Sequence, residues 1–321
     1  MNKDRKIYGI DISKGVFDLY NDTAGHLDFK NEEKGFKALL KSLPKDALVV
    51  MEATGCYHYR LAQYLHNNKV LVSVVNPLSV KRFIQMKLAK VKTDKSDAKF
   101  IFDYATVNEV PLYRALTELQ SECLQLYQLL DVYIKQSTVT KNKLHGEKVL
   151  GIPSKAVYNS LNRTLKHLQK EILIIENRLL ELVKQEQQEQ LTLLQTIPGI
   201  GLKTALFLVV TTNGFEKFET ASQLCSYAGI TPTIRQSGSS LRGKSRISKV
   251  GNRKLRRLLF LSAFSACRYN KACKAIFDRL VLKGKSKKLA LIAVANKLLK
   301  QAFAIAKSRL PYDENFVSKL V

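Results

Sequence analysis

Short apolar runs separated by turn residues fill the first part of the chain. KIYGIDIS at residues 6–13 and ALVVMEATG at residues 47–55 each reach an acid near their ends, Asp11 and Glu52. GVFDLY at residues 15–20 and the run HLDFK, separated by the turn sequence NDTAG, have the same character. Apolar runs of this length bounded by turn residues predict strands. We therefore expect three antiparallel strands, followed by a buried strand that ends on an acid.

Helical periodicity separates the later strands. Residues 32–43 carry apolar side chains at helical spacing, and a second helical segment runs from about 57 to 65. The apolar run VLVSVVNP follows, and Pro77 ends it. Antiparallel strands followed by crossover helices and further strands predict a mixed sheet flanked by helices, an α/β fold. Ligands collect at strand ends in such sheets, so Asp11 and Glu52 are candidate site residues.

The middle of the chain repeats leucine at alternating steps of three and four. Two heptad series flank a break at LGIPS, with Leu116, Leu119, Cys123, Leu126, Leu130 and Tyr133 before it and Leu161, Leu165, Leu168, Ile172, Ile175, Leu179 and Leu182 after it. Such stripes are packing seams of long helices, so we expect a coiled-coil connector. The pattern is compatible with an antiparallel hairpin and with arms that pair between subunits.

Apolar helical patterns return in the last third of the chain, which we expect to be mostly α-helical. TIPGIGLKTALFLV at residues 196–209 contains a glycine-rich turn between two of them. This resembles a helix-hairpin-helix element, in which backbone amides contact a phosphate. Gly199, Gly201 and Lys203 are the candidate contacts, and a plain helix–helix turn is the alternative. Residues 253–308 predict further apolar helices around the basic loop KGKSKK.

The charge of the chain narrows the choice of partners. Its 321 residues include 53 Lys and Arg against 27 Asp and Glu, a formal charge of +26. Such an excess repels itself unless a polyanion neutralises it, and nucleic acid is the usual polyanion. A merely basic soluble protein and a membrane-surface binder are the alternatives.

Membrane and secretory signals are weak in this sequence. No run approaches about 20 uncharged apolar residues, and the N-terminal residues lack the apolar core of a signal peptide. The five cysteines are scattered without a CxxC pair, which suggests neither a disulfide framework nor a zinc site. We therefore expect a cytoplasmic protein that does not act in a membrane.

Basic residues crowd the polar segment YAGITPTIRQSGSSLRGKSRISKVGNRKLRR at residues 227–257. A segment this polar and rich in Gly and Ser buries itself poorly, so composition alone predicts a flexible phosphate-binding loop. The candidate nucleic-acid contacts are Arg235, Arg242, Lys244, Arg246, Lys249 and Arg253, with Lys254, Arg256 and Arg257 beyond them.

Two further acids lie three residues apart in KTDKSDAK at residues 92–99. On a helix Asp94 and Asp97 share one face. They are either part of a solvated face, with Asp94 as a helix cap, or a pair of metal ligands beside a phosphate-binding surface. If Asp11 and Glu52 converge with them, the four carboxylates repel unless cations lie among them, and Mg²⁺ prefers oxygen ligands. Two such ions stabilise the attacking and leaving oxygens in phosphoryl transfer.

The motifs GIDISK, MEATGCY and KTDKSDAK resemble the RuvC-like, RNase-H-type domain of the DEDD insertion-sequence transposases. These form the insertion-sequence one-ten family, which includes bridge-RNA-guided recombinases. The resemblance implies that Asp11, Glu52, Asp94 and Asp97 bind Mg²⁺.

The run AGITP followed by SGSSLRGKSRISKVGN resembles the C-terminal transposase domain of the same family. One serine there is the nucleophile that attacks DNA, and the motif places it at Ser237, with Ser239 and Ser240 as the neighbouring alternatives. A serine hydroxyl needs activation, and no histidine lies near it in sequence. A metal-bound phosphate surrounded by arginines would supply that activation.

The resemblance implies a RuvC-like domain at residues 1–113, a coiled-coil hairpin at 114–189 and a transposase domain at 190–321. It implies a recombinase that cuts and rejoins element and target DNA through a covalent phosphoserine, as a dimer or tetramer. An element-encoded guide RNA is the further partner that it suggests.

Two rival functions remain on the sequence. A RuvC-like Mg²⁺-dependent junction nuclease would need the four acids and no serine. A non-catalytic RNA–protein scaffold could combine the same kind of domain with a coiled coil, but it leaves the four acids without a role.

Overall fold

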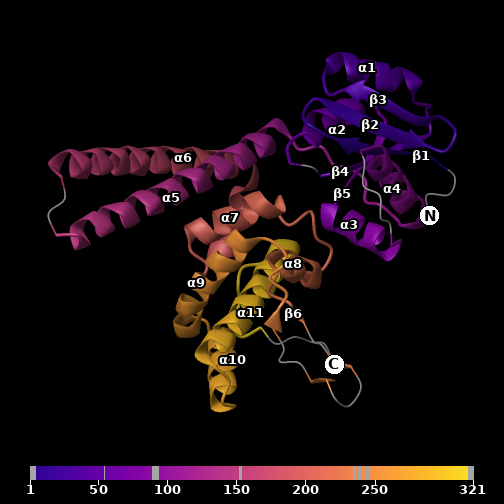
Figure 1. Cartoon of the computed structure of the whole chain (residues 1–321). Helices are drawn as coiled ribbons and strands as arrows, with labels where there is room; N and C mark the ends of the chain where they lie inside the picture. The colour runs from indigo at the N-terminus through magenta and orange to yellow at the C-terminus, as the bar shows by residue number, and fades with distance from the viewer. Residues whose placement is uncertain are drawn as a thin grey trace. The chain divides into compact units, whose positions relative to one another are not determined.

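The computed structural model describes residues 5–53, 55–88, 94–151, 154–233, 236–237, 241–242 and 246–316, with the backbone alone at 94–95, 236–237 and 241–242. Contacts divide the chain into two compact units, Met1–Leu116 and Thr117–Val321 (Figure 1). The predicted coiled coil and the C-terminal helices belong to one unit. The three-part division into 1–113, 114–189 and 190–321 stays a prediction.

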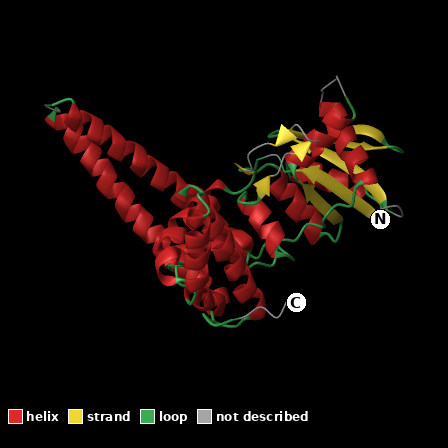
Figure 2. Cartoon of the chain, turned by 90° about the horizontal axis from the view of Figure 1, so that it is seen from below, coloured by secondary structure: helices red, strands yellow, loops and turns green. Residues whose placement is uncertain are grey.

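A mixed sheet of five strands forms the centre of the first unit and appears in yellow in Figure 2. The strands are β1 (Lys6–Ile12), β2 (Val16–Asn21), β3 (Gly25–Lys30), β4 (Ala47–Glu52) and β5 (Leu71–Val75). They lie in the order β3-β2-β1-β4-β5, where β1–β2 and β2–β3 are antiparallel and β1–β4 and β4–β5 are parallel. The predicted mixed α/β arrangement is confirmed.

Helices cover both faces of this sheet. They are α1 (Glu33–Ser42), α2 (His58–Asn67), α3 (Pro77–Met86) and α4 (Asp94–Val107). α1 and α2 pack on the face where Phe17 and Leu19 are buried. α3 and α4 pack on the face where Ile7 and Val50 are buried. Successive strand residues point to opposite faces, so the apolar β1 and β4 supply both cores.

α4 lies directly against the central strand β1 at a glycine. A side chain at Gly9 would overlap the carbonyl oxygen of Ala98 and the backbone nitrogen of Phe102, and it would lie 2.9 Å from the Phe102 Cα. These neighbours are backbone atoms, which cannot move aside without shifting the helix. The lack of a side chain at Gly9 therefore sets how closely α4 approaches the sheet.

A long helical hairpin opens the second unit. α5 (Glu118–Val149) and α6 (Lys155–Gln195) pack side by side in opposite directions (Figure 1). The two leucine series therefore form the antiparallel hairpin, one of the two predicted alternatives. Leu130 and Leu179 are among the buried seam residues. A backbone break at Gln187, where φ is −134° and ψ is 30°, kinks α6 before it reaches the remaining helices.

The rest of the second unit is mostly helical, as the sequence predicts. Its helices are α7 (Leu202–Thr212), α8 (Ala221–Ala228), α9 (Arg253–Tyr269), α10 (Lys271–Leu282) and α11 (Lys287–Ser308). By length and composition α11 could cross a membrane, but half of its most apolar window is buried inside the protein. Because it packs against α6, α8, α9 and α10, we interpret α11 as the core helix of this unit.

The basic segment is more regular than the predicted flexible loop. It contains four short strands, β6 (Pro232–Thr233), β7 (Gln236–Ser237), β8 (Leu241–Arg242) and β9 (Arg246–Ile247). β6 pairs with β9 and β7 with β8, both antiparallel. These pairings form a nested hairpin, and the segment's last residues form the start of α9. Backbone pairing between segments that composition marks as polar explains the difference, since a ladder needs no apolar side chains.

Candidate active site

Asp11 and Glu52 lie side by side at the ends of neighbouring strands. β1 and β4 are parallel, with Ile10 opposite Met51, so the next positions along the two strands are Asp11 and Glu52. Neighbouring strands lie about 4.8 Å apart, and laterally paired residues point to the same face. Both acids are partly buried and share the α4 face with Gly9. The structure therefore brings together two of the four predicted acids.

Helix α4 is held against the strand that carries Asp11, through contacts at Ala98 and Phe102. Asp97 lies one residue before Ala98, whose carbonyl oxygen contacts Gly9, and Asp11 lies two residues beyond Gly9 on the same face of β1. Asp94 is the first residue of α4, three residues before Asp97, and its side chain lies outside the described ones. The shared helix face that the spacing of Asp94 and Asp97 indicates stays a prediction.

The described side chains do not by themselves form a cluster of three potential metal ligands. The predicted set of four depends on Asp94, which is not among them. The assignment of Asp11, Glu52, Asp94 and Asp97 as metal ligands therefore stays a prediction.

Asp11 and Glu52 belong to a row of acids that continues across β2 and β3, where sequence patterns identified no site residue. We call this set the acidic row. Asp18 on β2 is the register partner of Asp11, and Asp28 on β3 is the register partner of Asp18. His26 Nε2 lies 2.6 Å from Asp18 Oδ1, and both side chains are mostly buried. Pairing GVFDLY with KIYGIDIS in register would have found Asp18, because the antiparallel alignment sets the two acids opposite each other. The row therefore places Asp18 beside Asp11, and Asp28 and His26 one strand farther from it.

The predicted nucleophile lies in the second unit. Ser237 is in β7, opposite Leu241 of β8, and its side chain lies outside the described ones. Gly238, Ser239 and Ser240 lie outside the described residues altogether. The choice of Ser237 stays a prediction that rests on the motif.

Several of the predicted nucleic-acid contacts are exposed to solvent. Arg246 on β9, Lys249 and Arg253 at the start of α9 are exposed. Arg242 contributes its backbone to β8, while Arg235 and Lys244 fall outside the described residues. The exposed cations are available to a phosphate backbone, and their role as contacts stays a prediction.

The glycine-rich turn before α7 combines a packing role with an open helix end. Gly199 has a φ of +105°, and a side chain there would lie 2.7 Å from Ala266 of α9. This glycine is therefore explained by packing, as in the plain-turn alternative. Gly201, which precedes α7, has no neighbour within 4 Å of the position of an added side chain. Lys203 Nζ lies 2.7 Å from Glu176 Oε1, so a phosphate there would compete with an ion pair.

Comparisons with known proteins cover both units. The family model described as "Transposase" matches residues 8–150, and the model "Transposase IS116/IS110/IS902 family" matches residues 191–278. The "Pilin gene-inverting protein" of Moraxella bovis is 30% identical over 95% of this chain and 97% of its own length. The homologous protein of Moraxella lacunata has the same identity and coverage. The "Transposase for insertion sequence element IS1111A" of Coxiella burnetii is 26% identical over 92% of this chain and 88% of its own length.

These matches agree with the order of the motifs along the chain. The first model spans the acidic row and α4, and the second spans the glycine-rich turn, the nested hairpin and α9. The chain belongs to the IS110 family of DEDD transposases, which act on DNA.

Proposed function

We propose that this transposase cuts and rejoins DNA strands with two groups of residues, the acids of the first unit and a serine of the second. The observation that carries the proposal is the pairing of Asp11 with Glu52 next to the first turn of α4. Relatives named for inverting a pilin gene and for moving an insertion sequence support a reaction in which strands are both broken and resealed.

The acids fit a divalent metal by their chemistry. Asp11 and Glu52 at the ends of two strands, and Asp97 on α4, offer the hard carboxylate oxygens that Mg²⁺ prefers. Asp94 would complete the set. We propose that the fold of this unit is RuvC-like. When bound, Mg²⁺ stabilises negative charge on the oxygens of a phosphoryl group. The protein positions these carboxylates through the β1–β4 register and through the glycine contact that fixes α4.

Ser237 is the proposed nucleophile. Its hydroxyl oxygen forms a bond to a DNA phosphorus, the bond from that phosphorus to the leaving deoxyribose oxygen breaks, and the serine proton ends on that oxygen or in solvent. Rejoining reverses these steps with a new hydroxyl. The exposed Arg246 and Arg253 near the nested hairpin support this role, because cations there would offset charge on the phosphate.

The proposed partners follow from charge and family. DNA is the substrate, and a guide RNA encoded by the element is a second polyanion that a chain of charge +26 can accommodate. We further propose a dimer or tetramer that acts in the cytoplasm.

Trapping the intermediate tests this function. Protein, Mg²⁺ and DNA that carries the element junction are mixed with and without RNA co-purified from the expressing cell, then separated on a denaturing gel. We expect a protein–DNA adduct that Ser237→Ala and Asp11→Asn both abolish, and dependence on the RNA would identify a guide.

The rival functions give different gels. Cleavage without an adduct, unchanged in Ser237→Ala, would indicate a metal-dependent nuclease. Tight RNA binding with neither cleavage nor adduct, unchanged in Asp11→Asn and Asp94→Asn, would indicate a scaffold.

A further inference from the structure

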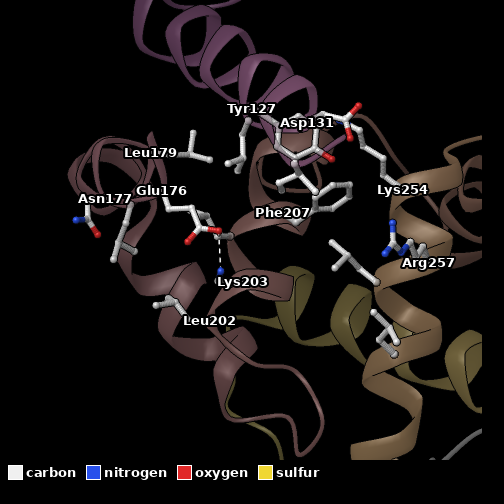
Figure 3. A pocket seen from close by; sticks show the side chains of 16 residues that line it. Tyr127, Asp131, Glu176, Asn177, Leu179, Leu202, Lys203, Phe207, Lys254 and Arg257 are labelled. Carbon is white, nitrogen blue, oxygen red and sulfur yellow. Dashed lines mark hydrogen bonds and ion pairs between the residues drawn. The ribbon is translucent and has the colours of Figure 1, made fainter. Parts of the chain in front are cut away.

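A cavity of about 330 Å³ lies within the second unit, between α5, α6, α7 and α9 (Figure 3). Its walls are mostly apolar. They include Leu130 and Ile134 of α5, Leu179 and Leu180 of α6, Leu202, Leu206 and Phe207 of α7, and Leu258 and Leu261 of α9. The volume is at the lower end of the range of about 300–1,000 Å³ that small ligands occupy, so the cavity suits one compact group and not a helix.

Three basic side chains line the same cavity, and they differ in their partners. Lys203 pairs with Glu176 at 2.7 Å, and Lys254 pairs with Asp131 at 2.9 Å. Arg257 makes no hydrogen bond or ion pair with any residue in the described part of the chain. One cation therefore remains free for an anion, which disfavours a cationic or wholly apolar ligand.

A buried hydroxyl also lacks a partner. The Oη atom of Tyr127 is inaccessible to solvent and makes no hydrogen bond with the described residues. Its ring packs edge-on against Phe207 with centroids 4.7 Å apart, and Lys254 Nζ lies 4.4 Å from its ring centre. Burial raises the pKa of Tyr127, and the negative charge of Asp131 raises it further. The phenol therefore stays neutral and can donate a hydrogen bond. Because this oxygen is closed off from the cavity, Tyr127 lines the wall with its ring and not with its hydroxyl group.

The basic residues come from the two segments whose sequences predicted phosphate contacts. Lys203 follows the glycine-rich turn, and Lys254 and Arg257 end the basic segment at residues 227–257. Folding brings segments about fifty residues apart around one apolar cavity. Lys203 and Arg257, both labelled in Figure 3, come from different helices, α7 and α9. The first turns of both helices favour anions.

We propose that this cavity receives one unstacked nucleotide of the bound strand, with its base among the apolar walls and its phosphate near Arg257. The proposal rests on the nucleic-acid binding of the proposed function. A bare phosphate would leave the apolar walls without a partner, whereas a nucleotide joins a flat apolar body to one anionic group. Proteins that bind single strands combine cationic grooves with side chains that contact splayed bases in this way.

Tryptophan fluorescence tests the proposal, because the chain contains no tryptophan. Leu261→Trp places one at the wall of the cavity, and Phe264→Trp places one on the same helix outside it. Leu261 and Phe264 are 55% and 50% exposed, so both positions can accept a larger side chain and are similarly solvated. The full-length variants are titrated with single-stranded oligothymidylate, oligouridylate and an abasic strand of equal length.

We expect oligothymidylate to quench the fluorescence of Leu261→Trp and to leave that of Phe264→Trp unchanged. The abasic strand should not quench, and its affinity should be lower by about ten-fold or more, since a stacked base contributes that much. Preference for oligouridylate over oligothymidylate would identify RNA as the source of the nucleotide. Adding Arg257→Gln to Leu261→Trp should remove the quenching at saturation. Arg253 is exposed and lies outside the cavity, so adding Arg253→Gln instead should lower the affinity for the strand but leave the quenching at saturation unchanged.

Equal quenching in both tryptophan variants, or quenching by the abasic strand, would overturn the proposal. Binding without selective quenching would refute the cavity site alone, while no binding by any variant would refute the strand binding on which it depends. A spectral shift of Leu261→Trp that follows protein concentration and ignores the strand would show a protein side chain in the cavity instead.

Discussion

The backbone of Gly9 on β1 contacts the backbone of Ala98 on α4, and no room remains for a side chain. This contact holds α4, at the residue after Asp97, against the strand that carries Asp11. β1 and α4, which are far apart in sequence, can therefore pack this closely because residue 9 has no side chain.

Replacing Gly9 tests that relationship. We expect Gly9→Ala to lower the free energy of unfolding by about 1–3 kcal/mol, as overpacking does. Adduct formation should fall further than the folded fraction, because α4 must shift. Thermal unfolding and the adduct assay on the same samples measure both. Gly15→Ala is the matched control, since nothing lies within 4 Å of an added side chain there, and a Gly9→Ala protein as stable and active as this control would contradict the account.

Asp18, which pairs with His26, distinguishes the four proposed metal ligands from the other acids on β2 and β3. Because His26 engages the Asp18 carboxylate at 2.6 Å, we expect Asp18→Asn to keep adduct formation within a few-fold of the parent. Asp11→Asn should abolish it. Both substitutions remove one charge from neighbouring positions, so folding is monitored by circular dichroism. Loss of adduct in a folded Asp18→Asn protein would place Asp18 among the essential acids.

Buried thiols predict a loss of stability at alkaline pH. Burial raises the pKa of Cys273 to about 12 and that of Cys123 to about 11. In the unfolded chain these thiols ionise above about pH 8.5. Their contribution is therefore fully present below pH 8.5 and is lost as pH rises toward 11–12, by up to about 1.4 kcal/mol per thiol and pH unit.

Urea unfolding at pH 8 and pH 10 measures this loss. A double variant, Cys123→Ala with Cys273→Ala, should lose less stability over the same interval than the parent, even if it is less stable at pH 8. Equal losses in the two proteins would assign the alkaline sensitivity to other groups.

Asn270 joins three parts of the second unit. Its side chain accepts from the backbone nitrogen of Cys273, donates to Pro198 and Gln301, and accepts from the hydroxyl of Tyr312. It is 1% exposed, so Asn270→Ala leaves buried polar groups unpaired and should lower the free energy of unfolding by about 1–3 kcal/mol.

Tyr312→Phe is the graded comparison, because it removes one of these bonds and should lower the free energy of unfolding by about 1 kcal/mol. Chemical denaturation of both variants measures the difference. A Tyr312→Phe effect as large as that of Asn270→Ala would mean that the shared network does not determine stability here.

The sequence predicted the elements of this fold better than their contacts. Apolar runs and leucine heptads located the strands of the first unit and the long helices, because burial imposes their periods directly. The sequence analysis did not predict the break between α9 and α10, where Asn270 caps α10 by accepting from the backbone nitrogen of Cys273. The packing of Gly199 against Ala266 could not be predicted from the sequence, because it depends on a partner 67 positions away.

The candidate site divides in a similar way. Asp11 and Glu52 could be predicted from strand ends, but Asp18 and His26 could not be identified until the register of β1, β2 and β3 was known. The cavity was invisible in the sequence because its walls come from four helices whose residues read individually as packing seams.

The most direct test of the account is to locate the bond between protein and DNA. The trapped adduct is digested with a protease and a nuclease, and the nucleotide-bearing peptide is sequenced by mass spectrometry. We expect a nucleotide linked through phosphate to the oxygen of Ser237, formed only when Asp11 is intact. Linkage at Ser239, Ser240 or any other residue would contradict it.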